Sequence, residues 1–256
     1  GVPNIGGDLK LHKSFNTNPL VNVCAMGIVK KEDIIYGTAN EPELYMIYVG
    51  SKTGNEGING AAMASNNFLD ATVDDESKTN IQKSDPYLEK LLLEACCELS
   101  KQGIIEGMQD MGAGGILCAT LEVIKRGREK SRRNIGCKIH VEQIPVKANH
   151  EMNPCDILIS ESQERMLIVA QKENIETISS VFQKWDLEFS VIGKTDLTGE
   201  YSIYEKDKLL YTEKMDAFRD VQDYTNFPSD HSVRQDEWKG GIDPPQKIKD
   251  MNLWQQ

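Results

Sequence analysis

Residues 104–124 place a short apolar segment, a glycine-rich turn and an amphipathic helix in direct succession. The apolar segment 104–108 predicts a strand, which carries Asp110 to its C-terminal end. Three glycines follow within 112–115, and apolar side chains then recur at helical spacing until Gly127, where we expect the helix to stop. A strand, a glycine turn and a helix in this order are typical of folds that bind phosphate at the ends of strands.

Asp110 is the candidate metal ligand of this turn. A carboxylate can hold a hard divalent cation such as Mg²⁺, while free N–H groups at the start of a helix attract anions. An aspartate also suits this place as a turn or helix-capping residue, and the spacing alone leaves both interpretations open. A single carboxylate would leave most of the magnesium coordination to phosphate, water or other parts of the protein.

A second polar cluster lies at 160–165, directly before the apolar segment 166–170. Glu161, Ser162 and Gln163 would be costly to place beside a buried strand unless they meet hydrogen-bond partners. Their carboxylate, hydroxyl and amide groups together suit a neutral polar group of a substrate. The alternative is a loop that satisfies its own hydrogen bonds as it enters the strand.

Composition and charge indicate a globular protein and argue against some classes of binding partner. With 256 residues, of which 39% are hydrophobic and 27% charged, the chain is typical of a globular protein with one large domain or two smaller ones. A net charge of −11 argues against general binding to nucleic acids or anionic membranes. The basic segment 125–133 departs from this trend. We interpret it as a solvated loop after a helix, with contact to an anionic partner as the alternative.

The six cysteines form no CxxC pair and no spacing typical of zinc ligands, which favours reduced thiols and a cytoplasmic protein. No apolar run reaches 18 residues, so the sequence predicts no membrane-spanning helix. The four histidines show no pattern of partners, and a Ser-His-Asp, Cys-His or P-loop arrangement is missing from the sequence.

The remaining periodicity outlines further elements. Asp85 and Pro86 are typical of the first residues of a helix, which we expect to end near Gly103. Apolar runs predict buried strands at 20–30 and 44–50. Toward the end of the chain, the pattern predicts a β-α-β unit followed by a hairpin, at 166–170, 175–185, 187–193 and 201–211.

Six motifs occur in an order that is hard to obtain by chance: Gly1–Asp8, Asn18–Asn22, Tyr48–Gly54, Asp85–Ala95, Met108–Gly115 and Ser160–Leu167. In this order they resemble the first half of phosphoribosylformylglycinamidine synthase, the ATP-dependent amidotransferase of purine synthesis. The resemblance covers about residues 1–215.

This resemblance implies an α+β fold. Residues 43–215 would form a C-terminal domain like that of aminoimidazole ribonucleotide synthetase, with a split β-α-β, ferredoxin-like core. Residues 1–42 would be the end of a preceding α/β domain of the N-terminal type, and 216–256 a linker toward a second half. We therefore expect the chain to be an internal fragment of a longer enzyme.

The resemblance also implies roles for individual residues. In the family, the aspartate of the Gln-Asp-Met-Gly motif binds magnesium, which assigns that role to Asp110. The family's Glu-Ser-Gln triplet contacts formylglycinamide ribonucleotide, which assigns substrate contacts to Glu161, Ser162 and Gln163. A glutamine shortly before the Asp-Pro helix contacts the same substrate, and Gln82 fills this position. No catalytic residue is expected within the chain, because the family's histidine-containing segment would lie upstream.

The implied activity is the ATP-dependent conversion of formylglycinamide ribonucleotide and glutamine-derived ammonia to formylglycinamidine ribonucleotide, with Mg²⁺ as cofactor and ATP as a substrate. The partners would be the remainder of the synthetase chain and a glutaminase domain or subunit, and the isolated chain would be inactive. Two alternatives stay open. One is another ATP-dependent enzyme of the superfamily, such as an aminoimidazole ribonucleotide or selenophosphate synthetase, and the other is a non-catalytic ligand-binding or assembly module.

Overall fold

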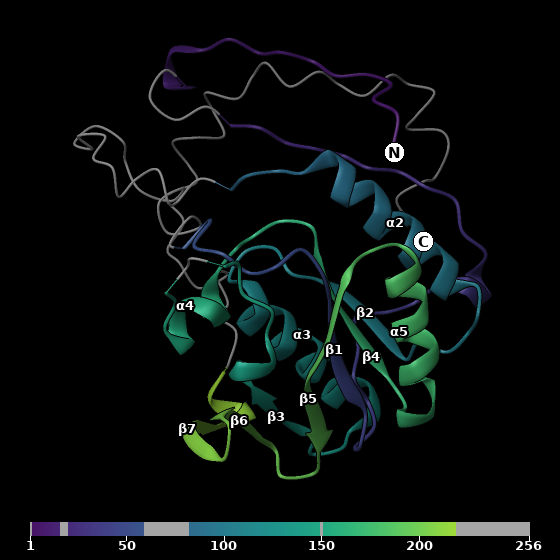
Figure 1. Cartoon of the computed structure of the whole chain (residues 1–256). Helices are drawn as coiled ribbons and strands as arrows, with labels where there is room; N and C mark the ends of the chain where they lie inside the picture. The colour runs from purple at the N-terminus through teal and green to yellow at the C-terminus, as the bar shows by residue number, and fades with distance from the viewer. Residues whose placement is uncertain (1, 16–19, 59–81, 149–150, 219–256) are drawn as a thin grey trace, which may run out of the picture. The chain divides into compact units, whose positions relative to one another are not determined.

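The structure is a computed structural model that describes residues 2–15, 20–58, 82–148 and 151–218. Within these ranges, seven strands and four α-helices form one body (Figure 1). In chain order they are β1 (Tyr45–Gly50), α2 (Pro86–Ser100), β2 (Gly107–Asp110), α3 (Gly115–Ser131), β3 (Gly136–His140), α4 (Pro154–Ile159), β4 (Arg165–Ala170), α5 (Ile175–Lys184), β5 (Glu188–Asp196), β6 (Glu200–Glu205) and β7 (Lys208–Lys214).

The strands form a single sheet in the order β2-β4-β1-β5-β3-β6-β7. All neighbouring strands are antiparallel except β3 and β6, which run parallel. The predicted strand at 44–50, the β-α-β unit and the hairpin are thereby confirmed, as is the α+β fold class. The strand β3 and the short helix α4 were not predicted from the sequence.

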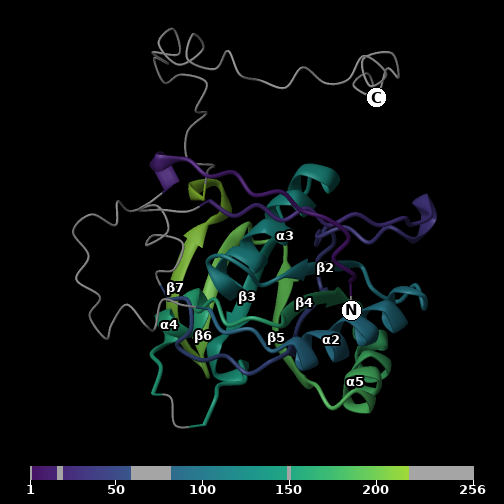
Figure 2. The ribbon, with the colours of Figure 1, turned by 90° about the horizontal axis from the view of Figure 1, so that it is seen from above.

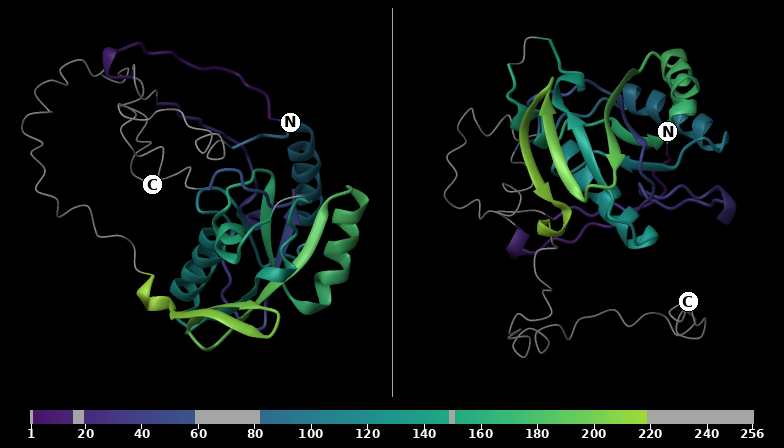
Figure 3. Two further views of the ribbon diagram at one scale, coloured as in Figure 1. Left: turned by 60° about the vertical axis from the view of Figure 1, so that its left-hand side comes forward. Right: turned by 90° about the horizontal axis from the view of Figure 1, so that it is seen from below.

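Helices cover both faces of the sheet. On one face α2 and α5 pack against β1 and β4 around a cluster that includes Ile47, Val49, Leu99 and Phe182. Helix α3 lies on the other face, as two further orientations show (Figures 2 and 3), where the Thr120 hydroxyl lies 2.8 Å from the hydroxyl of Tyr201 on β6. The core therefore has two apolar layers, one on each side of the sheet.

Helix α2 begins as the sequence predicts. Oδ1 of Asp85 accepts hydrogen bonds from the N–H groups of Tyr87 and Leu88 at 3.1 and 3.0 Å, and Pro86 occupies the first turn. The N–H group of Asp85 itself donates to Oε1 of Glu164 at 2.9 Å. This contact ties the start of the helix to the polar cluster at 160–165.

Helix α3 does not stop at Gly127 but continues to Ser131, which corrects the expected end of this helix. A side chain at Gly127 would overlap the carbonyl of Ala39, whose N–H group donates to the carbonyl of Val123 at 2.9 Å. The glycine therefore allows close packing against the 38–40 segment instead of ending the helix. Most of the basic segment 125–133 is consequently helical, and not the loop that we expected.

Three arginines of this segment have acidic partners within the chain. Arg128 pairs with Asp216 at 2.7 Å, Arg126 pairs with Glu122 at 2.8 Å, and Arg133 pairs with Glu41.

The predicted strand at 20–30 is absent, and the residues of this segment are exposed. Leu20, Val23 and Ile28 are 69%, 89% and 105% exposed, and no strand of the described residues pairs with them. An apolar run becomes a strand only where a neighbour can accept its main-chain hydrogen bonds. The predicted boundary at residue 42 stays a prediction, and the predicted linker 216–256 lies outside the described residues after Phe218. Among the described helices, none has the length and apolarity to span a membrane.

Candidate functional site

Asp110 is the last residue of β2 and is exposed at the edge of the sheet. Its Oδ1 accepts a hydrogen bond from Nε2 of Gln109 at 2.7 Å, and Oε1 of Gln109 accepts one from Arg126 at 2.6 Å. This chain of two contacts fixes one carboxylate oxygen, while Oδ2 lies next to Gly112. Asp110 is therefore presented at the end of its strand, close to where the sequence places it.

The glycine turn brings the start of α3 against the second polar cluster. Gly114 and Gly115 both have positive φ, of 70° and 57°, a region that glycine adopts at little cost. A side chain at Gly115 would overlap the carbonyl of Ser160. The N–H group of Gly114 donates to Oε1 of Glu161 at 3.0 Å. Asp110 and Glu161 thus flank one turn, although they are 51 positions apart in the sequence.

Glu161 is the centre of the triplet. It is 4% exposed, and its second carboxylate oxygen, Oε2, accepts from Nε2 of Gln82 at 2.8 Å. Its main chain donates to the carbonyl of Glu56 at 3.0 Å, and its carbonyl accepts from Nε2 of Gln163 at 3.0 Å. Three of the four residues predicted to bind substrate, Gln82, Glu161 and Gln163, are therefore joined by hydrogen bonds.

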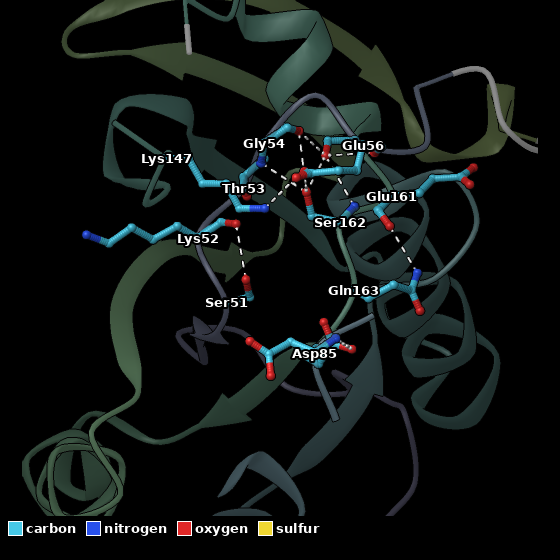
Figure 4. Close-up of polar contacts among 12 residues, drawn as sticks. Ser51, Lys52, Thr53, Gly54, Glu56, Asp85, Lys147, Glu161, Ser162 and Gln163 are labelled. Carbon is cyan, nitrogen blue, oxygen red and sulfur yellow. Dashed lines mark hydrogen bonds and ion pairs between the residues drawn. The ribbon is translucent and has the colours of Figure 1, made fainter. Parts of the chain in front are cut away.

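Ser162 belongs to an adjoining buried cluster that includes two residues the sequence did not single out, Glu56 and Lys147. The hydroxyl of Ser162 donates to Oε2 of Glu56 at 2.7 Å and accepts from the N–H group of Gly54 at 2.9 Å. Lys147 Nζ lies 2.5 Å from the other carboxylate oxygen of Glu56 (Figure 4). Burial raises the pKa of Glu56, but the hydrogen bonds from Lys147 and Ser162 outweigh this and lower it to about 2.

The loop that carries Glu56 has a recognisable sequence signal. Gly54 and Gly57 stand at regular spacing directly after the apolar strand β1, and a parallel bridge between Thr53 and Val146 brings Lys147 alongside. Glycines after a strand indicate a close backbone approach, which could have drawn attention to this loop. The partner at Lys147 follows only from tertiary structure, because 91 residues separate it from Glu56.

A cavity of about 300 Å³ lies between α2 and the edge formed by β2 and β4. Asp110 and Gly112 line it from one side and Gln163 from another, while Leu92 and Cys96 contribute apolar surface from α2. Asp110 and Gln163 therefore open onto a common pocket, whereas Glu161 and Ser162 lie behind its wall and do not line it.

The described residues suit a magnesium ion only in part. No group of three acidic, histidine or cysteine side chains within the described ranges could enclose a metal. Asp110 could supply one oxygen from its exposed position beside the cavity. This matches the coordination of Mg²⁺ by one or two carboxylates, with water and phosphate supplying the other oxygens.

Comparison with known proteins identifies the family. Residues 41–206 match the model of the AIR synthase related protein, C-terminal domain. The chain belongs to this family. It is 44% identical over 207 residues to the phosphoribosylformylglycinamidine synthase subunit PurL of Campylobacter hominis, and 43% identical over 213 residues to PurL of Campylobacter jejuni. These stretches cover 80% and 82% of the chain but only 27% and 28% of the two relatives, so the chain spans little more than a quarter of their length.

Solved structures agree with this membership of the AIR synthase related family. PurL of Thermotoga maritima, in a complex with FGAR, matches with a TM-score of 0.66 and 32% identity over 78% of this chain and 32% of that one. The PurLQS structure from the same organism matches with a TM-score of 0.61 at 28% identity. The resemblance derived from the six motifs is thereby confirmed. The roles of Asp110, Gln82 and the triplet stay predictions.

Proposed function

We propose that the domain holds the substrate of an ATP-dependent ligase that converts formylglycinamide ribonucleotide, ATP and glutamine-derived ammonia to formylglycinamidine ribonucleotide in purine biosynthesis. The PurL relatives support this proposal, since one solved relative is a complex with FGAR and another a complex with ATP. The alternative synthetases of the superfamily have no comparable support.

The observation that carries the proposal is the bridging position of Glu161. One oxygen of its carboxylate accepts from Gly114, in the turn after Asp110, and the other accepts from Gln82. A buried carboxylate held by two donors is a rigid anchor, and rigid support is what a binding site needs to orient a ligand.

In this proposal each side chain of the candidate site has a role that follows from its functional group. Gln82 and Gln163 present amide groups, which can both donate to and accept from the formylglycinamide portion of the substrate. Glu161 holds both amides, because its carboxylate accepts from Gln82 and its carbonyl accepts from Gln163, while Ser162 fixes the neighbouring loop through its hydrogen bond to Glu56. Asp110 would hold Mg²⁺, which neutralises the charge of the phosphate during transfer when bound.

The proposal includes partners that lie beyond the described domain. The proposed reaction needs the remainder of a synthetase chain and a glutaminase domain or subunit that supplies ammonia. A cytoplasmic location also belongs to the proposal. We expect the isolated chain to lack turnover, because reacting groups accelerate a reaction only when they are assembled in one geometry.

Calorimetric titration of the chain with formylglycinamide ribonucleotide, with and without Mg²⁺, tests the proposal. We expect saturable binding, and we expect Gln163→Ala to weaken it at least tenfold. Asp110→Asn is the matched control, since it should remove any dependence on Mg²⁺ and leave metal-free binding of the ribonucleotide intact. Preference for a different ribonucleotide would favour another synthetase, and failure of any nucleotide to bind would favour an assembly module.

A further inference from the structure

Arg165 is a buried arginine whose three donor nitrogens all contact the polar cluster or the loop beside it. The residue is 3% exposed at the start of β4. Its Nε donates to the carbonyl of Ser162 at 2.6 Å, and Nη2 donates to the carbonyl of Ser160 at 2.5 Å. Nη1 donates to Oγ1 of Thr53 at 3.0 Å. The two carbonyls flank Glu161, so one guanidinium holds the backbone on both sides of this carboxylate.

This arrangement needs the shape of arginine as well as its charge. A guanidinium presents donors in a fixed planar fork, whereas a lysine ammonium is a compact charge on a flexible stem. Burial lowers the pKa of Arg165, and the carboxylates of Glu56 and Glu161 are among the groups that oppose this shift. The side chain therefore supplies positive charge to a region with two acidic residues, while its hydrogen bonds go to neutral oxygens.

We propose that Arg165 is a positioning residue for the substrate site, a proposal that rests on the function inferred above. By fixing the carbonyls of Ser160 and Ser162, Arg165 sets the direction of the Glu161 carboxylate toward Gly114 and Gln82. The same constraint holds Gln163 at the wall of the cavity. Arg165 also lines this cavity, but its donors are directed at protein oxygens, so it acts through the backbone and not on the ligand.

The decisive variants are Arg165→Lys and Arg128→Lys. Arg165→Lys keeps the charge and removes the fork. Arg128 is a matched control, because it also donates to a backbone carbonyl, that of Ile135 at 3.0 Å, and lies near the opposite end of α3 from the polar cluster. For the full chain carrying each change, affinity for formylglycinamide ribonucleotide is measured by calorimetry at a temperature where circular dichroism shows both variants folded. Amide hydrogen exchange at 161–163 is measured in the absence of ligand.

We expect Arg165→Lys to weaken ribonucleotide binding at least tenfold and to speed exchange at 161–163 at least tenfold, with the core strand β1 unchanged. Arg128→Lys should change neither quantity at the site. A folded Arg165→Lys variant with wild-type affinity would overturn the proposal. If the wild-type chain binds no ribonucleotide, the proposed function fails, and the exchange measurement still decides the role of Arg165. Unchanged exchange at 161–163 would then show that Arg165 does not position this segment.

Discussion

The N–H group of Gly114 donates a 3.0 Å hydrogen bond to Oε1 of Glu161, and this contact joins two polar clusters that lie far apart in the sequence. Gly114 follows the candidate metal ligand Asp110, and Glu161 opens the Glu-Ser-Gln triplet. A single buried carboxylate therefore connects the glycine turn with the residues proposed to hold the substrate.

Replacing Glu161 by glutamine tests the strength of this connection. The variant removes the negative charge that strengthens both hydrogen bonds, and it leaves one acceptor oxygen where Gly114 and Gln82 now have two. Leaving a buried donor without an acceptor costs about 1 to 3 kcal/mol, so we expect a loss of that size in the free energy of unfolding in urea. The exposed Glu173→Gln is the control and should change stability by less than about 0.5 kcal/mol. Equal stability of both variants would contradict the bridging role of Glu161.

The pH dependence of stability tests the cluster around Glu56. Its pKa is lowered to about 2 in the folded chain, from an ordinary value of 4.5, so the folded state favours the ionised form. This contribution is complete above pH 4.5 and disappears as the pH falls toward 2. We expect the difference in unfolding free energy between the wild type and Glu56→Gln to shrink by on the order of 2 kcal/mol across this range. A difference that stays constant with pH would show that Glu56 is not held by Lys147 and Ser162.

Comparing the stabilities of Gly115→Ala and Gly103→Ala separates the cost of backbone strain from the cost of steric overlap between an added side chain and its neighbours. Both glycines have positive φ, of 57° and 64°, but an added side chain at Gly103 meets open space, whereas at Gly115 it overlaps the carbonyl of Ser160. We expect Gly103→Ala to cost about 1 kcal/mol of unfolding free energy. Gly115→Ala should cost at least about 2 kcal/mol more, because the turn must move away from the triplet. Similar losses in thermal or urea unfolding would argue against close packing at Gly115.

We expect Gly127→Ala to lower the free energy of unfolding, whereas replacing a glycine inside a helix by alanine usually raises it. Alanine ordinarily stabilises a helix interior by about 0.5 to 1 kcal/mol relative to glycine. At Gly127 the new methyl group would overlap the carbonyl of Ala39, and overpacking of this kind costs about 1 to 3 kcal/mol. We therefore predict a net loss in unfolding free energy. A stabilised variant would show that α3 and the 38–40 segment are not in close contact.

Gly127 also shows where prediction from sequence reaches its limit. Apolar spacing located the helices at Pro86–Ser100 and Ile175–Lys184, because local periodicity and capping residues carry that information. A glycine in a helical pattern can mark the end of the helix or a place where another part of the backbone packs closely against it. For Gly127 only the position of Ala39 in the structure distinguishes the two. The strand predicted at the exposed segment 20–30 was wrong for a related reason, because an apolar run does not show which strand it would pair with.

Some residues of the candidate site could likewise be predicted from the sequence, and others could not. Asp110 and the triplet stand out in the sequence because glycines or polar runs interrupt apolar segments there. Gln82 could be assigned only through the family resemblance, and the structure places its amide 2.8 Å from Glu161. Lys147 and the role of Arg165 depend on contacts across 91 and 112 residues, which no local pattern encodes.

The central claim is that the turn after Asp110 and the Glu161–Gln163 triplet serve one binding site. Titrating the isotope-labelled chain with formylglycinamide ribonucleotide, and following its amide resonances, tests this most directly. We predict that the amides of 112–115 and 161–163 shift together and saturate at the same ligand concentration. Shifts confined to one of these two segments, with the other unmoved at saturation, would contradict the claim.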